Sequence, residues 1–567
     1  MASGMASGIA TAAPSAPSST APRRRSGVLL FAGLTALYFA VGYVLVIHHD
    51  LLDGDAASRV ANAGYVLISR DPHLSAMGFV WNPLPSMVEI PMLLFERWWP
   101  QLRTRGLAGV AQSALFMAGA ALMVRGIALD RKVSAGWRRV AVGAFALQPM
   151  IVVYGASGMS EAAEILCVLW CVRRLMRWSE SGATVDLAVA GLALGVGYTA
   201  RYEVAPAAVG AIVFVAVVAA HRAGAGSRRA ATAANVAIIT LPIVLAATVW
   251  AVAGWVINHE LFAIVSSQYG NESQVAGARR RGNVVRDSPA AWMTISARLL
   301  GMQPLVGIAS AGALAYATLA RRPAAVVPVV TFGPVLAFAA WGQYSASTFG
   351  LFRYFLLAIP MVICIALAFW TPGGGTRRAW AVGTRSGALA AVLLCVSVVV
   401  GFPVTVRAAL NDRISNQQLQ FVVNALLHPE RLPAQEQRYR QGLATDRLLA
   451  DYFDRQRLPA GSVLMDSFAA WGIWLNSADT KQFRVTSDYD FKAALNRPWQ
   501  YGVTYLVVTN PASTDADAIN IRYPTLWNDG AGFSILALTV MNGASDDDRF
   551  RIFRITGAPR TVLSPPQ

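Results

Sequence analysis

Two aspartates, Asp53 and Asp55, are separated by a single glycine. Carboxylates this close repel each other, so the pair calls for a partner cation, a metal ion or a proton-transfer task. The pair directly follows a long apolar run, which places it at a membrane surface. Asp55 could instead simply cap a following helix, but one aspartate suffices for a cap. We therefore expect a catalytic or cation-binding role, and the residues leave metal binding open.

The elements around this pair are expected to be membrane helices. Of 567 residues, 55% are hydrophobic and only 14% are charged, which is too apolar for a soluble globular protein of this length. A bilayer core requires about 20 apolar residues in a helix, and eleven runs approach this length. They are 27–47, 107–124, 140–156, 162–178, 186–200, 204–220, 232–256, 299–319, 325–342, 353–370 and 381–404.

The positive charge is a topology signal. A net charge of +17 would suggest nucleic-acid binding in a soluble protein. Nearly all of it lies in segments that are cytoplasmic if the N-terminus is inside, as the positive-inside rule requires. We therefore expect a multi-pass protein of the plasma (inner) membrane with no nucleic-acid partner. The composition, rich in Ala, Gly and Arg and poor in Lys, suggests a bacterial source.

The chain divides into three expected parts. Residues 1–26 form a cytoplasmic tail, whose first 22 residues are small or polar and predict disorder. Residues 27–404 form the membrane domain, and its first helix is too long for a cleaved signal segment. Residues 405–567 contain no further spanning run, and an odd number of crossings places them outside. The cysteines at 167, 171, 364 and 395 fall in predicted membrane helices, which leaves the outer domain without disulfides.

The first outer loop, residues 48–106, is expected to hold a fixed shape. It contains an amphipathic stretch from Ala57 to Ile68, which predicts a helix lying along the membrane surface. The tryptophans at 81, 98 and 99 and the prolines at 83, 85, 91 and 100 suit a rigid interfacial segment. This loop carries the aspartate pair, so its structure decides where the pair points.

The outer domain predicts an α/β or α+β fold. A polar helical segment, about 410–456, precedes five short β-like runs at 462–466, 483–486, 504–508, 534–538 and 550–554. It contains no phosphate-binding glycine loop, nucleophile elbow or metal-ligand spacing. We expect it to bind an acceptor glycan or to support the first outer loop.

The outer-face motifs together resemble a known superfamily. A long first outer loop with an Asp-x-Asp-like pair, a surface helix and a downstream Trp81-x-Pro resembles the C-type (GT-C) membrane glycosyltransferases. These include protein mannosyltransferases, aminoarabinose transferases and arabinofuranosyltransferases. Ser160-Glu161, the turn at 198–203, and Phe352-Arg353-Tyr354 match the same pattern, all on the expected outer face. The resemblance covers residues 27–370.

This resemblance implies an activity and assigns roles. Such enzymes transfer a sugar from a polyprenyl-phosphate donor to an extracytoplasmic acceptor, here a cell-wall glycan, glycolipid or protein, with inversion. A carboxylate deprotonates the acceptor while cations stabilise the departing phosphate. Asp55 would be the base, or Asp53 if the register differs. The phosphate ligands would come from Arg353, Arg201, Arg279, Arg280 and Arg281.

Further side chains are candidates for substrate binding, each with a simpler alternative. His73 could polarise a phosphate or bind a metal, although a lone loop histidine commonly does neither. Glu161 and Glu203 could orient a cation or sugar hydroxyls, or could simply lie at the membrane interface. The arginines at 279–281 could equally contact anionic headgroups. The candidates are completed by Trp81 and Tyr354.

Two other classes of function remain open. A multi-pass transporter or flippase of a lipid-linked or polar solute would commonly have internal repeats and charges near the bilayer midplane, and neither is evident. A non-catalytic binding protein of the cell envelope would leave Asp53 and Asp55 without a task. The sequence does not set the sugar, because selectivity depends on the geometry of a few loop side chains.

Overall fold

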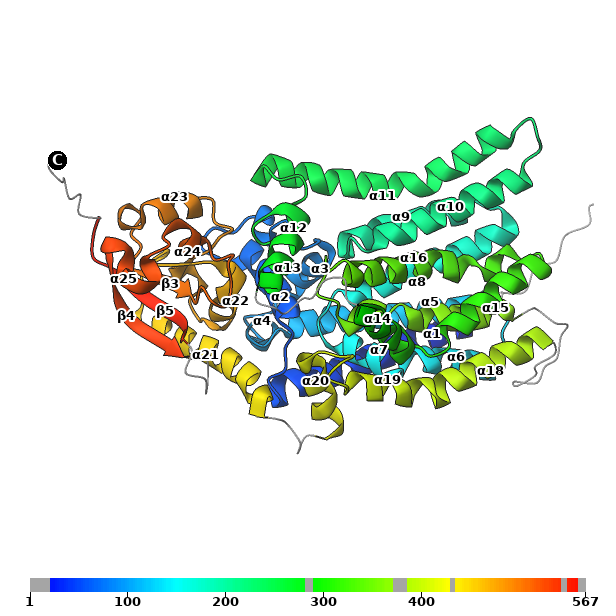
Figure 1. Cartoon of the computed structure of the whole chain (residues 1–567), viewed down its shortest axis with the longest axis horizontal. Coiled ribbons are helices and arrows are strands. Elements are labelled where there is room, and N and C mark those ends of the chain that lie inside the picture. The colour runs from blue at the N-terminus through cyan, green and yellow to red at the C-terminus, as the bar shows by residue number, and fades with distance from the viewer. Residues whose placement is uncertain (1–20, 281–288, 371–384, 429–433, 542–547, 559–567) are drawn as a thin grey trace, which may run out of the picture.

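A membrane bundle and a small outer domain make up the molecule. The computed structural model describes residues 21–280, 289–370, 385–428, 434–541 and 548–558. Figure 1 shows long helices at one end, the sheet-containing domain at the other, and the first outer loop between them. The predicted fold class is confirmed: a polytopic helical membrane protein with a mixed α/β domain at its C-terminal end.

The bundle consists of long helices interrupted by short breaks. Its elements are α1 (Ala21–Tyr43), η1 (Val44–His48), α5 (Leu107–Asp130), α6 (Ala135–Ala146), α7 (Pro149–Ala156), α8 (Glu161–Ser181), α9 (Thr184–Ala200), α10 (Val204–Arg222), α11 (Arg228–Asn258), α14 (Pro289–Met302), α15 (Val306–Leu319), η3 (Pro323–Ala325), α16 (Val327–Tyr344), η4 (Phe352–Phe355), α17 (Ala358–Phe369), α18 (Arg385–Val399) and α19 (Gly401–Ala409).

Within the described residues every expected span falls on helical structure, but not all of these helices have the length and composition of a span; residues 381–384 of the last expected span lie outside the described residues. Seven helices in the described ranges are long and apolar enough to cross a membrane, and nine if α6 with α7 and α14 with α15 each count as one bent span. The helices α8 and α9 are outside this count. The first contains several charged residues, and the second has only 17 residues. The number of eleven crossings stays a prediction.

The first outer loop is ordered, as expected, but its main helix is not a surface helix. It contains α2 (Gly54–Ile68), η2 (Leu74–Met77), α3 (Leu84–Leu93) and α4 (Gln101–Thr104). More than half of α2 is buried, because it packs against α3, α5 and the outer-domain helix α22 (Ser467–Asn476). Asp53, rather than Asp55, is the N-cap, and its Oδ1 accepts from the backbone N–H of Asp55 at 2.9 Å.

The outer domain is built on a five-stranded mixed sheet in the order β2-β1-β3-β5-β4. All five expected runs form strands: β1 (Val463–Met465), β2 (Phe483–Arg484), β3 (Tyr505–Thr509), β4 (Ser534–Met541) and β5 (Asp548–Ile555). Strand β1 pairs in parallel with β2 and β3, whereas β5 runs antiparallel to β3 and β4. Its helices are α20 (Gln417–Leu427), α21 (Ala434–Gln456), α22, α23 (Phe491–Asn496), α24 (Ala518–Arg522) and α25 (Leu526–Asp529), with short 3-10 turns η6 (Thr480–Gln482), η7 (Pro498–Gln500) and η8 (Gly530–Gly532).

A second outer segment, after α11, bridges the two parts of the molecule. It contains α12 (Ala263–Ser266) and α13 (Asn271–Arg280), which lie beside the outer domain in Figure 1. The Tyr269 hydroxyl donates to Asp466 of the outer domain at 2.7 Å. On the membrane side, the Asn271 amide donates to the Ser347 carbonyl at 2.9 Å.

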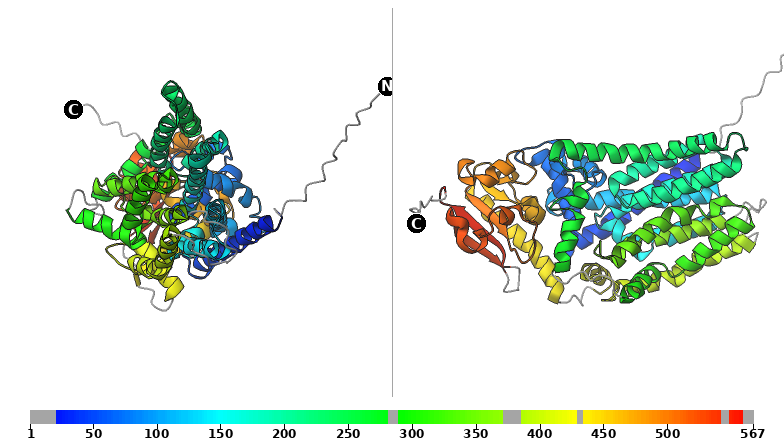
Figure 2. Two further views of the ribbon diagram at one scale, coloured as in Figure 1. Left: turned by 90° about the vertical axis from the view of Figure 1, so that its right-hand side faces the viewer. Right: turned by 45° about the horizontal axis from the view of Figure 1, so that its top comes forward.

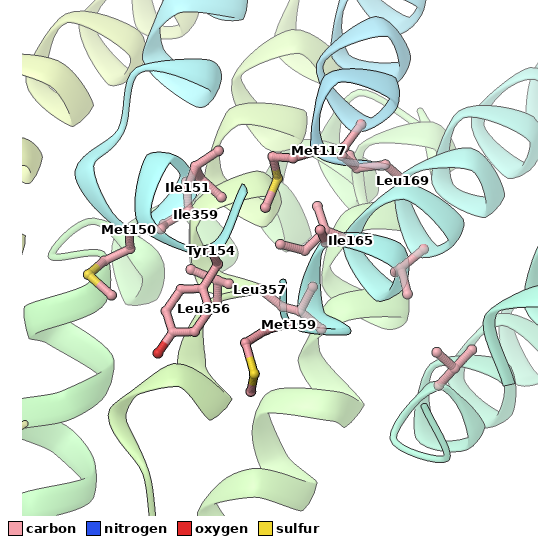
Figure 3. Close-up of a cluster of buried hydrophobic side chains, with 14 of the residues drawn as sticks. Met117, Met150, Ile151, Tyr154, Met159, Ile165, Leu169, Leu356, Leu357 and Ile359 are labelled. Atoms are coloured by element: carbon pink, nitrogen blue, oxygen red, sulfur yellow. The ribbon is translucent and has the colours of Figure 1, made fainter. Parts of the chain in front are cut away.

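An apolar core lies directly beneath the region where the loop meets the bundle. Figure 3 shows methionine, leucine and isoleucine side chains from several bundle helices packed together around Tyr154. Its members from the η4 and α17 region, including Leu356, Leu357 and Ile359, are buried. This packing fixes the chain that follows Arg353, so the arginine projects from a rigid base.

The outer domain is anchored to the first outer loop by a buried aromatic contact. Trp474 of α22 is fully buried and its ring lies 4.6 Å from that of Tyr65 on α2. A Cβ added to Gly64 would come within 2.6 Å of the same indole, so only glycine allows this approach. In the right-hand view of Figure 2 the outer domain lies directly against the first outer loop and the bundle.

We predict that Trp474→Ala weakens this anchor. Truncating a fully buried tryptophan commonly costs about 3–5 kcal/mol, because the transfer free energy is lost and a cavity remains. The purified full-length variant should therefore unfold at a lower temperature than wild type and be cleaved faster by protease. Trp98→Ala is the matched control, since Trp98 is 76% exposed and should tolerate the change. Equal unfolding temperatures for Trp474→Ala and wild type would contradict the anchoring role.

Candidate active site

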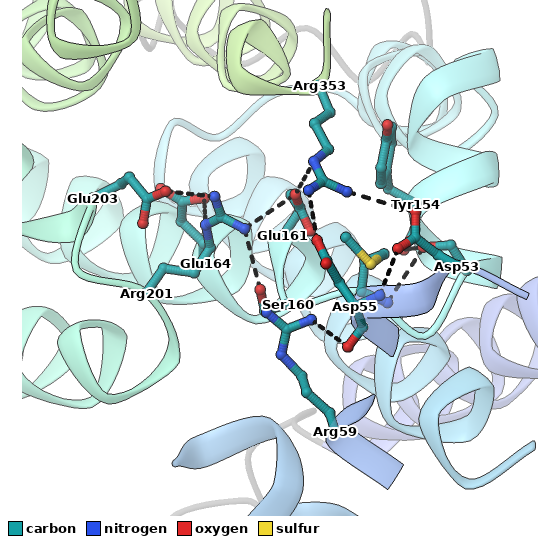
Figure 4. Close-up of polar contacts among 12 residues, drawn as sticks. Asp53, Asp55, Arg59, Tyr154, Ser160, Glu161, Glu164, Arg201, Glu203 and Arg353 are labelled. Carbon is teal, nitrogen blue, oxygen red and sulfur yellow. Dashed lines mark hydrogen bonds and ion pairs between the residues drawn. The ribbon is translucent and has the colours of Figure 1, made fainter. Parts of the chain in front are cut away.

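The expected aspartate pair meets an arginine from a distant part of the chain. Asp53 and Asp55 stand at the N-terminus of α2, and Arg353 projects from η4. The Arg353 Nη2 lies 2.6 Å from Asp55 Oδ2, and its Nη1 lies 3.6 Å from Asp53 Oδ2. The third nitrogen, Nε, lies 3.3 Å from Glu161 Oε1 at the start of α8. One guanidinium therefore joins three carboxylates, as Figure 4 shows.

A second arginine extends the cluster. Arg201 follows α9, and its Nη1 lies 3.0 Å from Glu161 Oε1. It also pairs with Glu164 at 3.1 Å and with Glu203 at 2.6 Å. Glu161 thus connects the two arginines, and four of the residues expected from sequence to line an outer site are brought together with the aspartates.

A third arginine, Arg59, belongs to the cluster and was missed by the sequence analysis. Its Nη1 donates to the Asp55 carbonyl at 3.1 Å, one turn earlier in α2. Its guanidinium lies 4.5 Å from the ring centroid of Trp81, so this expected substrate residue packs against a cation. The spacing Asp55-x-x-x-Arg59 was the available signal, since residues four apart share a helix face.

The cluster contains more acidic than basic groups. Its five carboxyl groups outnumber its three arginines, so at least some negative charge is uncompensated if all of them ionise. The members are Asp53, Asp55, Glu161, Glu164, Glu203, Arg59, Arg201 and Arg353. Such a balance favours taking up a proton or a cationic or hydrogen-bonding partner.

The pKa values of the two aspartates are shifted in opposite directions. Burial, with the neighbouring Asp55 charge, raises the pKa of Asp53 to about 6. Burial also acts to raise the pKa of Asp55, but Arg353 and Arg59 outweigh it and hold that pKa below its usual value. Asp55 is therefore ionised at neutral pH, as a general base must be before it takes a proton, and it is paired with a cation.

A pocket opens beside this cluster and has two kinds of wall. Arg201 and Arg353 line one end, together with the acidic groups near them. Apart from Thr348, the remaining lining residues are apolar or aromatic and come from α8, the turn between α9 and α10, α16 and the η4 region: Ile165, Tyr202, Val335, Phe338, Ala339, Tyr354, Leu356 and Leu357. This combination suits an amphipathic molecule with an anionic head.

Arg279 and Arg280 do not reach the cluster. Arg279 donates to the Ala346 carbonyl at 2.8 Å, and Arg280 pairs with Asp515 of the outer domain at 2.6 Å. Arg281 lies outside the described residues. The arginines at 279 and 280 therefore bind other parts of this chain.

His73 is likewise placed elsewhere. Its ring stacks on Tyr489 of the outer domain at 4.0 Å between centroids. By contrast, Tyr354 borders the site, since its ring centroid lies 5.9 Å from the Arg353 guanidinium. Within the described ranges, no group of three or more His, Cys, Asp or Glu side chains is arranged to hold a metal ion.

Comparisons with known proteins give a likeness in structure only. No family model matches the sequence, and a search of curated proteins finds no match either. Among solved structures, the chain is similar to ArnT from Cupriavidus metallidurans. The ArnT structure bound to undecaprenyl phosphate is 13% identical, covers 96% of this chain and 99% of its own, and has a TM-score of 0.47. The apo ArnT structure is 14% identical over 95% and 100% of the two chains, with a TM-score of 0.46.

We predict that Asp53→Asn stabilises the protein most at neutral pH. A folded-state pKa of about 6 against an ordinary 3.8 means that Asp53 opposes folding once it ionises, by about 1–3 kcal/mol above pH 6. Asparagine also caps helices, so the change removes the charge and keeps the cap. The unfolding temperature should rise at pH 7.5 and rise less at pH 4.5, where Asp53 is mostly protonated. An equal gain at both values would contradict the assignment.

Proposed function

We propose that this chain is an inverting membrane glycosyltransferase that uses a polyprenyl-phosphate sugar and an extracytoplasmic acceptor. The observation that carries the proposal is the position of Arg353. It joins Asp55 and Glu161 at the polar end of a pocket whose other wall is apolar. A base, cations and an amphipathic pocket at one place are the parts that this chemistry requires.

The donor phosphate is proposed to bind Arg353 and Arg201. A phosphodiester can accept two hydrogen bonds from one guanidinium, which makes arginine the suitable cation. Both arginines line the pocket, where ion pairs of their Nε atoms with Glu164 and Glu161 hold the two guanidiniums in place. Two fixed cations in a pocket with apolar lining support a phosphate there, with the prenyl chain against the apolar residues.

Asp55 is proposed as the base. In this arrangement the donor phosphate competes with Asp55 for Arg353, so donor binding releases the carboxylate. Asp55 then takes the proton of the acceptor hydroxyl, whose oxygen bonds to the anomeric carbon while the bond from that carbon to the phosphate oxygen breaks. The electron pair leaves with the lipid phosphate, and the arginines stabilise its charge. Because attack and departure occur on opposite faces, the anomeric configuration inverts.

The site is proposed to face away from the cytoplasm. The support is the concentration of positive charge in segments on the opposite side of the bundle from α2 and the outer domain. We accordingly place the N-terminus in the cytoplasm, and residues 405–567 outside the plasma (inner) membrane as an extracytoplasmic domain. A divalent metal at Asp53 and Asp55 has no role in the proposed steps, since both carboxylates face Arg353.

We predict that Asp55→Asn abolishes sugar transfer. A deletion strain is complemented with wild type, Asp55→Asn or Asp71→Asn at equal expression, and glycan and glycolipid linkages are then measured. Wild type should restore one missing linkage, and Asp55→Asn should reduce it by about 10²–10⁴-fold, the usual contribution of a general base. Asp71→Asn is the matched control, because Asp71 lies in the same loop and contacts Tyr489.

The outcome separates the three functional classes. Full restoration by Asp55→Asn would show that Asp55 is not the base. If deletion removes no linkage in a strain without a redundant enzyme, the transporter or binding alternative would replace the proposal.

We predict that Arg353→Lys weakens use of the lipid-linked donor. Lysine keeps the charge but cannot reach several partners in one plane, so one or two charge-assisted hydrogen bonds are lost, about 1.5–3 kcal/mol or roughly 10- to 100-fold in kcat/KM for the donor. Purified variants are assayed with deletion-strain membranes, which retain unused donor and acceptor. Arg280→Lys is the control and should match wild type. Equal loss in both variants would argue against a specific phosphate contact at Arg353.

A further inference from the structure

The outer domain places a tryptophan against the glycine that separates the two aspartates. Trp471 lies on α22, and a Cβ added to Gly54, the residue between Asp53 and Asp55, would be 3.7 Å from its Cζ2 atom. The indole is only partly buried. A large apolar ring thus remains accessible beside the proposed base.

The helix that carries Trp471 is held by contacts at its start and near its end. Asp466 caps its start by accepting from the Phe468 N–H at 2.8 Å. Near its end, Arg103 of α4 donates to the Trp474 and Leu475 carbonyls. One turn after Trp471, Trp474 is buried against α2. The position of Trp471 relative to the aspartates is therefore set by contacts that do not involve Trp471 itself.

A second aromatic pair continues the same surface. Phe468 is three residues before Trp471 and shares its helix face. It stacks on Tyr269 with ring centroids 5.3 Å apart, and Tyr269 is oriented by its hydrogen bond to Asp466. All three rings are partly exposed. Aromatic side chains from two segments far apart in sequence thus border the approach to α2.

This surface belongs to the outer domain and the segment after α11, whereas the proposed donor pocket belongs to the bundle. The pocket is formed by α8, the turn between α9 and α10, α16 and the η4 region. Helix α2 lies between the bundle and α22, since it packs against both. Inversion requires the acceptor to approach opposite the departing phosphate, and the outer-domain side of α2 supplies that approach.

We propose that Trp471, with Phe468 and Tyr269, forms the acceptor site of the transferase, and that the acceptor presents a sugar ring to it. Sugar rings have apolar C–H faces edged by hydroxyls, and a fixed aromatic ring packs against such a face without restricting the hydroxyls. A hydroxyl held this way can reach Asp55. The inference rests on the proposed function and assigns the acceptor to carbohydrates rather than peptides.

The test uses soluble acceptors with the full-length enzyme. Oligosaccharides released by mild acid from the whole envelope of the deletion strain serve as acceptors, and a lipid extract of the same strain supplies the donor. Wild type should glycosylate them. Trp471→Ala should raise the acceptor KM by about tenfold or more and change kcat by about twofold at most, because ring packing contributes to binding rather than to chemistry.

Two variants control for structural damage. Trp471→Phe keeps an aromatic face and should retain most of the acceptor affinity. Trp98→Ala removes an exposed tryptophan from the first outer loop and should behave as wild type. In all three variants the donor KM should be unchanged and kcat should stay within about twofold of wild type, whereas a loss of folded enzyme would lower the apparent kcat and leave the acceptor KM unchanged.

Two results would overturn the inference. One is that wild type restores the missing linkage in cells but accepts no oligosaccharide, which would indicate a peptide or other acceptor. The other is that Trp471→Ala has the same KM for the acceptor oligosaccharides as wild type. Failure of the underlying transferase proposal is distinguished by the deletion strain, which would then lose no sugar linkage.

Discussion

The pairing of Arg353 with acidic groups from two other segments is the interaction on which the site depends. Its guanidinium meets Asp55 from the first outer loop and Glu161 from α8. Each of these charges would be strongly destabilising if buried alone, whereas together they offset one another. The surrounding structure can be understood as the means of keeping them together: a packed core beneath η4, a capped start to α2, and an outer domain closing over it.

The same interaction sets how strongly the carboxylates of the cluster bind protons. Carboxylates held by arginines are poor bases, because the cations stabilise the ionised form. An arriving anion competes for those cations and changes the proton affinity of the groups it displaces. A site with many acidic groups is thus compatible with a negatively charged substrate, provided that the substrate takes the place of a carboxylate in an existing ion pair with an arginine.

Much of the architecture could be predicted from the sequence, because it depends on local patterns. Apolar runs identified the helices, short β-like runs identified all five strands, and the aspartate pair drew attention to the first outer loop. Arg201, Glu161 and Arg353 were found because each stands near an expected outer helix end.

The remaining features depend on tertiary contacts that the sequence does not show. Arg279 and His73 were expected to bind substrate, but their partners are the Ala346 carbonyl and Tyr489, which are distant in sequence. The helix α2 was expected at a membrane surface, because its amphipathic pattern does not distinguish a bilayer from a protein partner. Its second partner, α22, begins some four hundred residues later.

That separation has a consequence for biogenesis. The first outer loop contacts the outer domain through pairs such as Arg103 with Leu475 and Arg70 with Asp488, which are 372 and 418 residues apart. The loop is synthesised early, yet part of its packing surface belongs to residues that lie 372 and 418 positions further along the chain. A chain that stopped before α22 would lack the buried contact between Trp474 and Tyr65 that anchors the loop. The first outer loop therefore completes its packing only after α22 has been synthesised.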